Sequence, residues 1–476
     1  MTPPTTIGLF LLLTATAGAQ TFDRLFHNRT LRVDYYHSGT KGQEFFALEQ
    51  CHEEGEWAGS RHNLIDHLNR GEYQARVYDI ASATLIFSCG YSTLFNEWQT
   101  TDEAAHGQWR TFHESVLLPM PKGKIQFTIC RRDRQMNFRE IFSCVIDPNA
   151  PTQVNRSRRV PQSRITALQQ HGPADSKVDL VLLGDGYSAA EQEKFRRDAR
   201  HFNDVLFATS PFKERRQDFN VWLIEVISEE SGISKPGANV WKNNALGTAY
   251  DTFGSARYVL TTANKTLRDL AGQVPYDFIN ILVNDNRYGG GGIYRLYTTT
   301  YTISDQPGQE WQRDYVYVHE FGHSFAGLGD EYYSSQVSYN EFYAKNVEPW
   351  EPNITALLDK ANLKWKAFVL PNTPLPTPWE KAEYDSLALA RARLDRLAPD
   401  YYAKREPIFK RQEEILKKTQ YAGKVGAFEG AGYEARGLYR PSADCRMFSL
   451  SLVDFDPVCR AAIEQVIDFY TKPAAP

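Results

Sequence analysis

The sequence has 476 residues and a formal net charge of −4, with 42% hydrophobic and 24% charged residues. This composition is that of a folded, soluble protein, and the length exceeds what one hydrophobic core usually holds, so we expect two or three domains. The small negative charge gives no electrostatic basis for binding nucleic acid or an anionic membrane.

Residues 1–19 are predicted to be a signal peptide. An apolar run at residues 7–19 ends in Ala17-Gly18-Ala19, the pattern of small residues that signal peptidase cleaves, and it is too short to span a bilayer comfortably. No Lys or Arg precedes the run, which leaves an uncleaved membrane anchor as the alternative. We expect a mature protein that is secreted, periplasmic or at the cell surface, with no further membrane segment.

Residues 20–148 are predicted to form an N-terminal β-sandwich. Loops separate short, partly alternating segments that are rich in β-branched and aromatic residues, at residues 31–36, 75–79, 84–87 and 125–129. Many short strands of this kind are typical of two packed antiparallel sheets.

Six cysteines, an even number, make disulfides possible in an exported protein. Cys130 and Cys144 flank a predicted hairpin whose midpoint lies near Asn137, so we expect them to face each other across the strands. Cys445 and Cys459 form the second predicted pair because they are close in the sequence.

A linker is predicted at residues 149–176, which are rich in Pro, Gln, Ser and Arg, and a second domain at residues 177–476. The nearly continuous apolar run at residues 178–183 is typical of a strand buried on both faces. Further strands are predicted at residues 219–227 and 278–283. Strands that alternate with helical segments indicate an α/β domain.

Two capping boxes predict where helices begin. Ser188 with Glu191 is expected to cap a helix after the first buried strand. Thr377 with Glu380 is expected to cap a long charged helix, with Pro378 at its first helical position. This later helix is predicted to belong to a helical insertion whose charged residues are exposed to solvent.

Four consecutive glycines, residues 289–292, precede an apolar segment. No Lys-Ser or Lys-Thr follows, so they are not a nucleotide-binding loop. One interpretation is a strand edge at Gly291 and Gly292 that binds an extended substrate by β-addition. A plain flexible turn is the other interpretation.

The segment His319-Glu-Phe-Gly-His323 carries the most specific chemical signal. The two histidines are four residues apart, so they lie on one face of a predicted helix and can share one Zn²⁺ ion. Glu320 lies beside them, where it can act as general base on a metal-bound water whose pKa zinc lowers to roughly 7. A chance HExxH in an amphipathic helix is the alternative interpretation.

A catalytic zinc site needs a third protein ligand. No histidine follows His201 except the two of the motif, so a carboxylate is expected. Gly327 can end the helix and reverse the chain, which would bring Asp330 back toward the metal. Glu331 and Glu341 are the alternatives.

The sequence resembles the secreted immunoglobulin A metallopeptidase family over roughly residues 25–465. The segments that carry the resemblance are residues 184–187, 289–293, 319–332, 426–433 and 444–447. Family members are metzincin-like zinc endopeptidases, often with an N-terminal β-domain.

The resemblance implies zinc on His319, His323 and Asp330, with Glu320 as the base. It also implies that Met447, the only methionine after residue 136, lies in the turn that forms an apolar floor beneath the metal in metzincins. Metzincins place a glycine three residues before the third ligand, and Gly327 keeps that interval to Asp330.

The sequence departs from the standard metzincin pattern at two points. Gly327 comes one residue late relative to HExxHxxG, and Phe448-Ser449 stand where some metzincins carry a tyrosine near the metal. The residue that stabilises the oxyanion therefore stays open, with Tyr433 and Tyr439 as candidates.

Together these patterns predict a secreted zinc metalloendopeptidase: an N-terminal β-sandwich followed by an α/β metzincin-like domain with a helical insertion. Its partner would be a protein or peptide substrate, whose identity the sequence does not give. The alternative is a non-catalytic surface-binding module, for glycan or protein, in which the metal only stabilises the fold.

Overall fold

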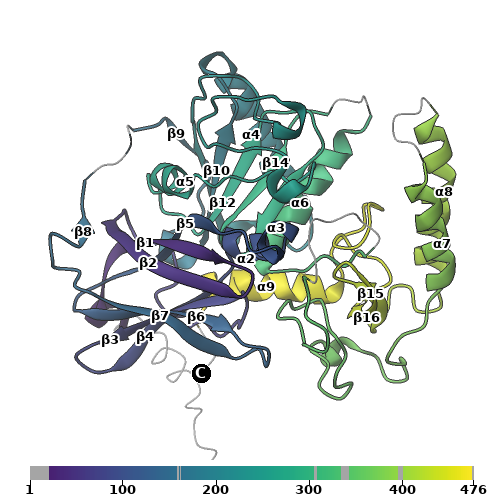
Figure 1. Cartoon of the computed structure of the whole chain (residues 1–476), viewed down its shortest axis with the longest axis horizontal. Coiled ribbons are helices and arrows are strands. Elements are labelled where there is room, and N and C mark those ends of the chain that lie inside the picture. The colour runs from purple at the N-terminus through teal and green to yellow at the C-terminus, as the bar shows by residue number, and fades with distance from the viewer. Residues whose placement is uncertain are drawn as a thin grey trace, which may run out of the picture.

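The computed structural model describes residues 21–157, 160, 162–304, 308–333, 342–394 and 400–473. It contains an N-terminal domain of two sheets and a larger C-terminal domain built around one six-stranded sheet (Figure 1). The predicted signal peptide at residues 1–19 lies outside the described residues. Within the part of the chain that is described, none of the helices is both long enough and apolar enough to cross a lipid bilayer.

The N-terminal domain consists of two four-stranded sheets around one core, as predicted for a sandwich. One sheet has the order β5-β1-β2-β8 and the other β4-β3-β6-β7. Apolar side chains from both sheets, such as Val33 in β1 and Phe127 in β6, belong to the same buried cluster. The strands are β1 (Phe26–Thr40), β2 (Gln43–Glu53), β3 (Tyr73–Asp79), β4 (Thr84–Tyr91), β5 (Arg110–Pro121), β6 (Ile125–Arg132), β7 (Phe138–Ile146) and β8 (Val154–Asn155), with short helices α2 (Leu94–Trp98) and α3 (Asp102–Ala105) before β5.

The expected facing pair of cysteines in the β6–β7 hairpin is not formed. The strand register pairs Cys130 with Glu140 and Cys144 with Phe127. Arg132 pairs with Phe138 at the end of the hairpin, so the chain reverses near Gln135 rather than near Asn137. The two thiols therefore lie at different levels of the hairpin. All six cysteines of the chain are free.

The C-terminal domain has a mixed sheet of order β13-β14-β12-β10-β11-β9. The four inner strands are parallel, and the edge strands β13 and β9 are antiparallel to their neighbours. The strands are β9 (Ile165–Gln169), β10 (Val178–Asp185), β11 (Phe219–Ile224), β12 (Phe278–Val283), β13 (Gly290–Ile293) and β14 (Tyr297–Tyr301). The predicted linker at residues 149–176 thus includes β8 and β9, which add an edge strand to each domain.

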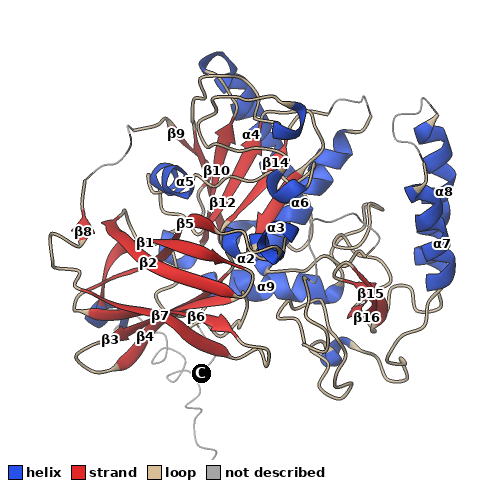
Figure 2. Ribbon diagram, in the orientation of Figure 1, coloured by secondary structure: helices blue, strands red, loops and turns tan. Residues whose placement is uncertain are grey.

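Helices cover both faces of this sheet (Figure 2). Every residue of β10 is buried, as its apolar run predicts, and its side chains alternate between two clusters. Leu180 and Leu182 pack with α4 (Gln192–Leu206), α6 (Glu310–Ala326) and α9 (Pro457–Thr471). Val181 and Leu183 pack on the other side with α5 (Asn264–Ala271).

The helical insertion lies between α6 and α9. It contains the helix pair α7 (Lys381–Ala392) and α8 (Tyr401–Lys418), followed by the hairpin of β15 (Phe428–Ala431) and β16 (Glu434–Arg440) (Figure 1). The capping box predicted at Thr377 is absent, and α7 begins at Lys381 instead. The hydroxyl of Thr377 accepts a hydrogen bond from the backbone of Ala427, so it is not available as a cap.

The two domains share a core and a buried ion network. Leu94, Phe95 and Trp98 of α2 join the apolar cluster on the α5 side of the sheet. On β1, the fully buried guanidinium of Arg32 lies 2.8 Å from carboxylate oxygens of Asp34, Glu54 and Asp269. Since Asp269 lies on α5, this ion network fixes the sandwich against the C-terminal sheet.

We predict that Arg32→Met lowers the free energy of unfolding by about 3–5 kcal/mol, because it leaves buried carboxylates without their counter-charge. Arg29→Met is the matched control on the same strand. Arg29 is half exposed and paired with Glu53, so its loss should cost less than about 1 kcal/mol. Denaturant unfolding of both variants measures the difference, and equal effects would contradict a structural role for the network.

Candidate functional site

The helix α6 carries the HExxH segment and lies against the glycine-bearing edge of the sheet. Its buried stripe contains Val318, Phe321 and Phe325, which pack on α4, α9 and the sheet. A Cβ atom on Gly292 would lie only 2.1 Å from the backbone oxygen of Glu320, and one on Gly290 would meet Val316 at 2.8 Å. The glycines therefore allow the helix to approach β13 closely.

The imidazoles of His319 and His323 converge. Their Nε2 atoms are 3.2 Å apart. Nδ1 of His323 lies 2.5 Å from the backbone oxygen of Leu328, and Nδ1 of His319 lies 3.1 Å from that of Arg446. Since a carbonyl only accepts, both Nδ1 atoms carry a proton, so Nε2 is the atom of each ring that a metal ion can bind.

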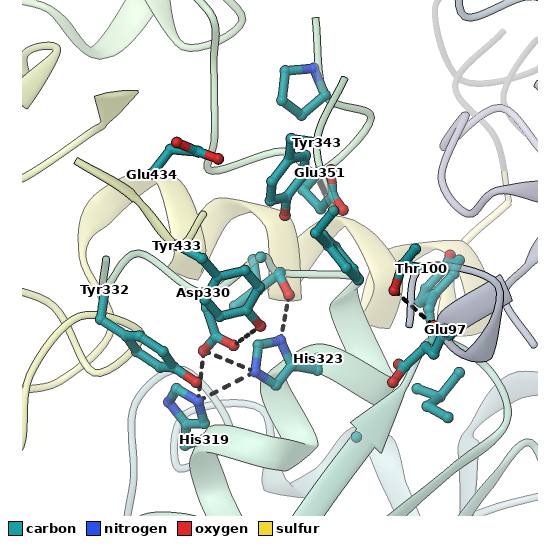
Figure 3. Close-up of a pocket in the computed structure, with 18 of the residues that line it drawn as sticks. Glu97, Thr100, His319, His323, Asp330, Tyr332, Tyr343, Glu351, Tyr433 and Glu434 are labelled. Atoms are coloured by element: carbon teal, nitrogen blue, oxygen red, sulfur yellow. Dashed lines mark hydrogen bonds and ion pairs between the residues drawn. The ribbon is translucent and has the colours of Figure 1, made fainter. Parts of the chain in front are cut away.

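Asp330 reaches the same point because the chain reverses at Gly327. This glycine ends α6 in the left-handed conformation, with φ 61° and ψ 33°, and its N–H donates to the carbonyl of His323. The Oδ1 atom of Asp330 then lies 3.0 Å from Nε2 of His319 and 3.2 Å from that of His323 (Figure 3). The second oxygen, Oδ2, accepts a 2.5 Å hydrogen bond from the hydroxyl of Tyr433.

These three donor atoms fit a tetrahedral metal site with an open fourth position. Their mutual distances are 3.0–3.2 Å. Neighbouring ligands of a tetrahedral ion lie about 3.3 Å apart when the metal–ligand bonds are about 2.0–2.1 Å. Two imidazoles and a carboxylate are also a common ligand set for a catalytic divalent cation.

The electrostatics of the site favour a positive charge at this point. Burial lowers the pKa of His323, but Asp330 raises it by more, and the net pKa is about 10. Burial raises the pKa of Asp330, but His323 and His319 hold it well below the ordinary range. Burial also raises the pKa of Glu320, which the two histidines lower by less, so Glu320 is a stronger base than an exposed glutamate.

Two residues that the sequence analysis missed lie beside the two histidines and Asp330. The ring of Tyr332 stacks on that of His319, with an interplanar angle of 19°. Its hydroxyl accepts a 3.2 Å hydrogen bond from the guanidinium of Arg257. The proximity of Tyr332 to Asp330 in the sequence was an available signal, but no local pattern points to Arg257.

The site forms part of the wall of a cavity of about 880 Å³. Both domains line it: Glu97, Arg131 and Arg132 come from the N-terminal domain, and Arg257 and Glu320 from the C-terminal domain. The insertion closes a third side through α7, α8 and the β15–β16 hairpin. Residues from all three parts of the chain therefore surround the cavity into which Glu320, His319, His323 and Asp330 face.

Of the other predicted site residues, two line the cavity and two do not. Gly292 and Tyr433 line it. Gly291 does not face the cavity, because a Cβ atom at this position would contact Leu260 and Tyr258. Tyr439 does not line the cavity, because β16 holds its backbone between Glu429 and Thr355.

Met447 is fully buried and packs against α6 at Gly322. A Cβ on Gly322 would lie 3.2 Å from its sulfur atom, so this helical glycine leaves room for the methionine. The carbonyl of Met447 accepts a hydrogen bond from the N–H of Glu331. The side chain of Glu331 points away from the histidines into a separate buried cluster, and the alternative ligand Glu341 lies outside the described residues.

Comparison with known protein families covers both domains. The family model described as IgA Peptidase M64 matches residues 166–467, which is more than half of the chain. The model described as Peptidase M64 N-terminus matches residues 21–143. No curated protein matches the sequence.

We predict that Tyr433→Phe weakens metal binding about 10–100-fold, because Asp330 loses the hydrogen bond that orients its carboxylate. Tyr439→Phe is the matched control, since Tyr439 lies in the same hairpin but outside the cavity. Competition with a chromogenic chelator measures both affinities. Equal affinities would show that the hydroxyl of Tyr433 does not support the site.

Proposed function

Since this chain belongs to the IgA peptidase M64 family, a family of metallopeptidases, we propose that it is a secreted zinc endopeptidase with Glu320 as its general base. Family membership makes it a metal-dependent hydrolase of peptide bonds, with a protein or peptide as substrate. One observation carries the finer assignment: three donor atoms 3.0–3.2 Å apart lie on the wall of a large cavity, beside a carboxylate of raised pKa.

In this mechanism His319, His323 and Asp330 would hold the ion. When bound there, zinc would lower the pKa of a water molecule and polarise the carbonyl of the scissile bond. Glu320 removes a proton from the attacking water and delivers it to the leaving amine. Arg257 and Tyr332 are placed to donate hydrogen bonds to the negative charge that develops on the carbonyl oxygen, a role for which neither Tyr433 nor Tyr439 is as well placed.

A metzincin-like arrangement is part of the proposal. It is supported by the helix end at Gly327, by the return of Asp330 and by the buried Met447 below the motif helix. The packing of Met447 against Gly322 supports its assignment as the apolar floor.

The alternative, a non-catalytic module with a structural metal, is less consistent with this geometry. A structural site usually has four protein ligands and is closed. Here three side chains converge, and the cavity opens beside them. A structural role would also leave the placement of Glu320 in the cavity without explanation.

We predict that Glu320→Ala keeps the bound metal but lowers the rate of casein hydrolysis about 10²–10⁴-fold, the range expected for loss of a general base. Glu310→Ala is the control, because Glu310 is exposed in the first turn of the same helix. Zinc should restore activity to chelator-treated wild type. Undiminished turnover by the Glu320 variant would end the mechanism, and an inactive zinc-loaded wild type would favour the binding module.

The third ligand is tested separately with Asp330→Ala. Loss of the carboxylate should abolish stoichiometric zinc binding at this site, since two imidazoles alone hold zinc weakly. Metal analysis after desalting gives the result. Full metal content in this variant would favour another carboxylate, such as Glu341, as the ligand.

Secretion is proposed from the apolar run at residues 7–19 and its small residues at positions 17–19. We expect the exported protein to begin at Gln20 when its N-terminus is sequenced. An intact N-terminus in a membrane fraction would indicate an uncleaved anchor instead.

A further inference from the structure

Four metal-binding side chains meet in the core behind the proposed active site. Glu331, Cys445, Asp456 and Cys459 each offer one donor atom, and these atoms all lie within 4.8 Å of one another. Glu331 and both cysteines are fully buried, and Asp456 is 6% exposed. None of the four belongs to the group formed by His319, His323 and Asp330.

The two thiols are close but not bonded. The sulfur atoms of Cys445 and Cys459 are 3.8 Å apart, whereas the sequence predicts a disulfide between them. Two thiolates on one tetrahedral ion lie about 3.8 Å apart when each metal–sulfur bond is about 2.3 Å. The sulfur of Cys459 also lies 3.2 Å from Oε1 of Glu331, close to the sulfur–oxygen separation of about 3.5 Å in such a site.

One oxygen atom of each carboxylate is available to bind a cation. Oδ1 of Asp456 caps α9 by accepting hydrogen bonds from the N–H groups of Val458 and Cys459. Its Oδ2 atom and Oε2 of Glu331 have no hydrogen-bond partner among the described residues. Two buried carboxylates that face each other repel unless a proton or a cation lies between them.

Two backbone N–H groups hold the sulfur atom of Cys445 in place. Its sulfur accepts hydrogen bonds from the backbone N–H groups of Met447, at 3.5 Å, and of Asp456, at 3.4 Å. Such N–H···S bonds orient and stabilise sulfur ligands of metal sites. Asn353 donates a 2.9 Å hydrogen bond to Oε1 of Glu331, which holds that carboxylate in turn.

We propose that Glu331, Cys445, Asp456 and Cys459 form a second, structural metal site for a zinc-like divalent cation. Two sulfur and two oxygen donors complete a tetrahedron, so no position remains for a substrate or a reactive water. Thiolate ligands favour Zn²⁺ over Mg²⁺ or Ca²⁺. Binding releases the two thiol protons and joins the segment after α6, the Met447 turn and α9 through one ion.

The test uses the full-length mature chain, purified under reducing conditions and loaded with Co²⁺ in place of the native metal. We expect two equivalents of metal per chain and a near-ultraviolet thiolate-to-cobalt charge-transfer band. The group of His319, His323 and Asp330 contains no sulfur, so it cannot give this band. The wild-type spectrum therefore reports on the second site without any substitution.

Variants show which of the two sites binds each equivalent of metal. The double variant Cys445→Ser/Cys459→Ser should lose one equivalent and the band, whereas Cys89→Ser, in the N-terminal domain, should keep both. His319→Ala/His323→Ala should lose the other equivalent and retain the band, so failure of the proposed peptidase site and failure of the second site are distinguishable. If the double cysteine variant does not fold, Asp456→Asn is expected to weaken the band in folded protein.

Two results would overturn the proposal. One is a single equivalent of metal in wild type with no charge-transfer band. The other is an intact mass two hydrogens lower under non-reducing conditions, with the peptides of Cys445 and Cys459 joined, which would establish the disulfide instead.

Discussion

The site depends on one steric constraint: the helix α6 has to lie in close contact both with a sheet edge and with a sulfur atom. Glycines on β13 let the backbone of Glu320 approach the edge strand, and Gly322 leaves room for Met447 on the side of the buried core. A side chain on Gly292 would collide with the backbone of the helix, and one on Gly322 would press on the sulfur atom of Met447. Because the two imidazoles project from this helix, the positions of their Nε2 atoms follow from the packing of glycines.

Backbone hydrogen bonds to two other segments hold the chain at Asp330, whose carboxylate is the third group that meets the two imidazoles. The carbonyl of Asp330 accepts from the N–H of Gly432, and the N–H of Glu331 donates to the carbonyl of Met447. Tyr433, one residue further along the hairpin, then bonds the carboxylate itself. Segments more than a hundred residues apart therefore preorganise the ligand, which lowers the conformational entropy lost when a metal binds.

Local patterns in the sequence predicted those features that depend on neighbouring residues. The apolar run of β10, the strands of the sandwich and the capping box at Ser188 all appear in the structure, because burial alternation and first-turn capping act over a few residues. The capping box at Thr377 fails because its hydroxyl bonds Ala427, fifty residues later. The Cys130–Cys144 pairing fails because the hairpin turns near Gln135, two residues before the midpoint that the cysteine spacing suggests.

In the site, too, the features set by neighbouring residues were predictable, and the contacts between distant segments were not. The helix spacing of the two histidines and the chain reversal at Gly327 are local, and they bring Asp330 to the histidines as the sequence indicates. The contact between Arg257 and Tyr332 joins a loop before the sheet edge to the segment after α6. Only the folded chain brings that pair together, so no sequence spacing could have identified Arg257.

Two adjacent carboxylates end up in different chemical environments. Asp330 faces the histidines and the cavity, while Glu331 faces the cysteines in the core. The turn that follows Cys445 carries Met447, whose carbonyl fixes the N–H of Glu331. A ligand that tightens the buried cluster would thus hold both Met447 and the segment that carries Asp330, and it would do so without touching the substrate.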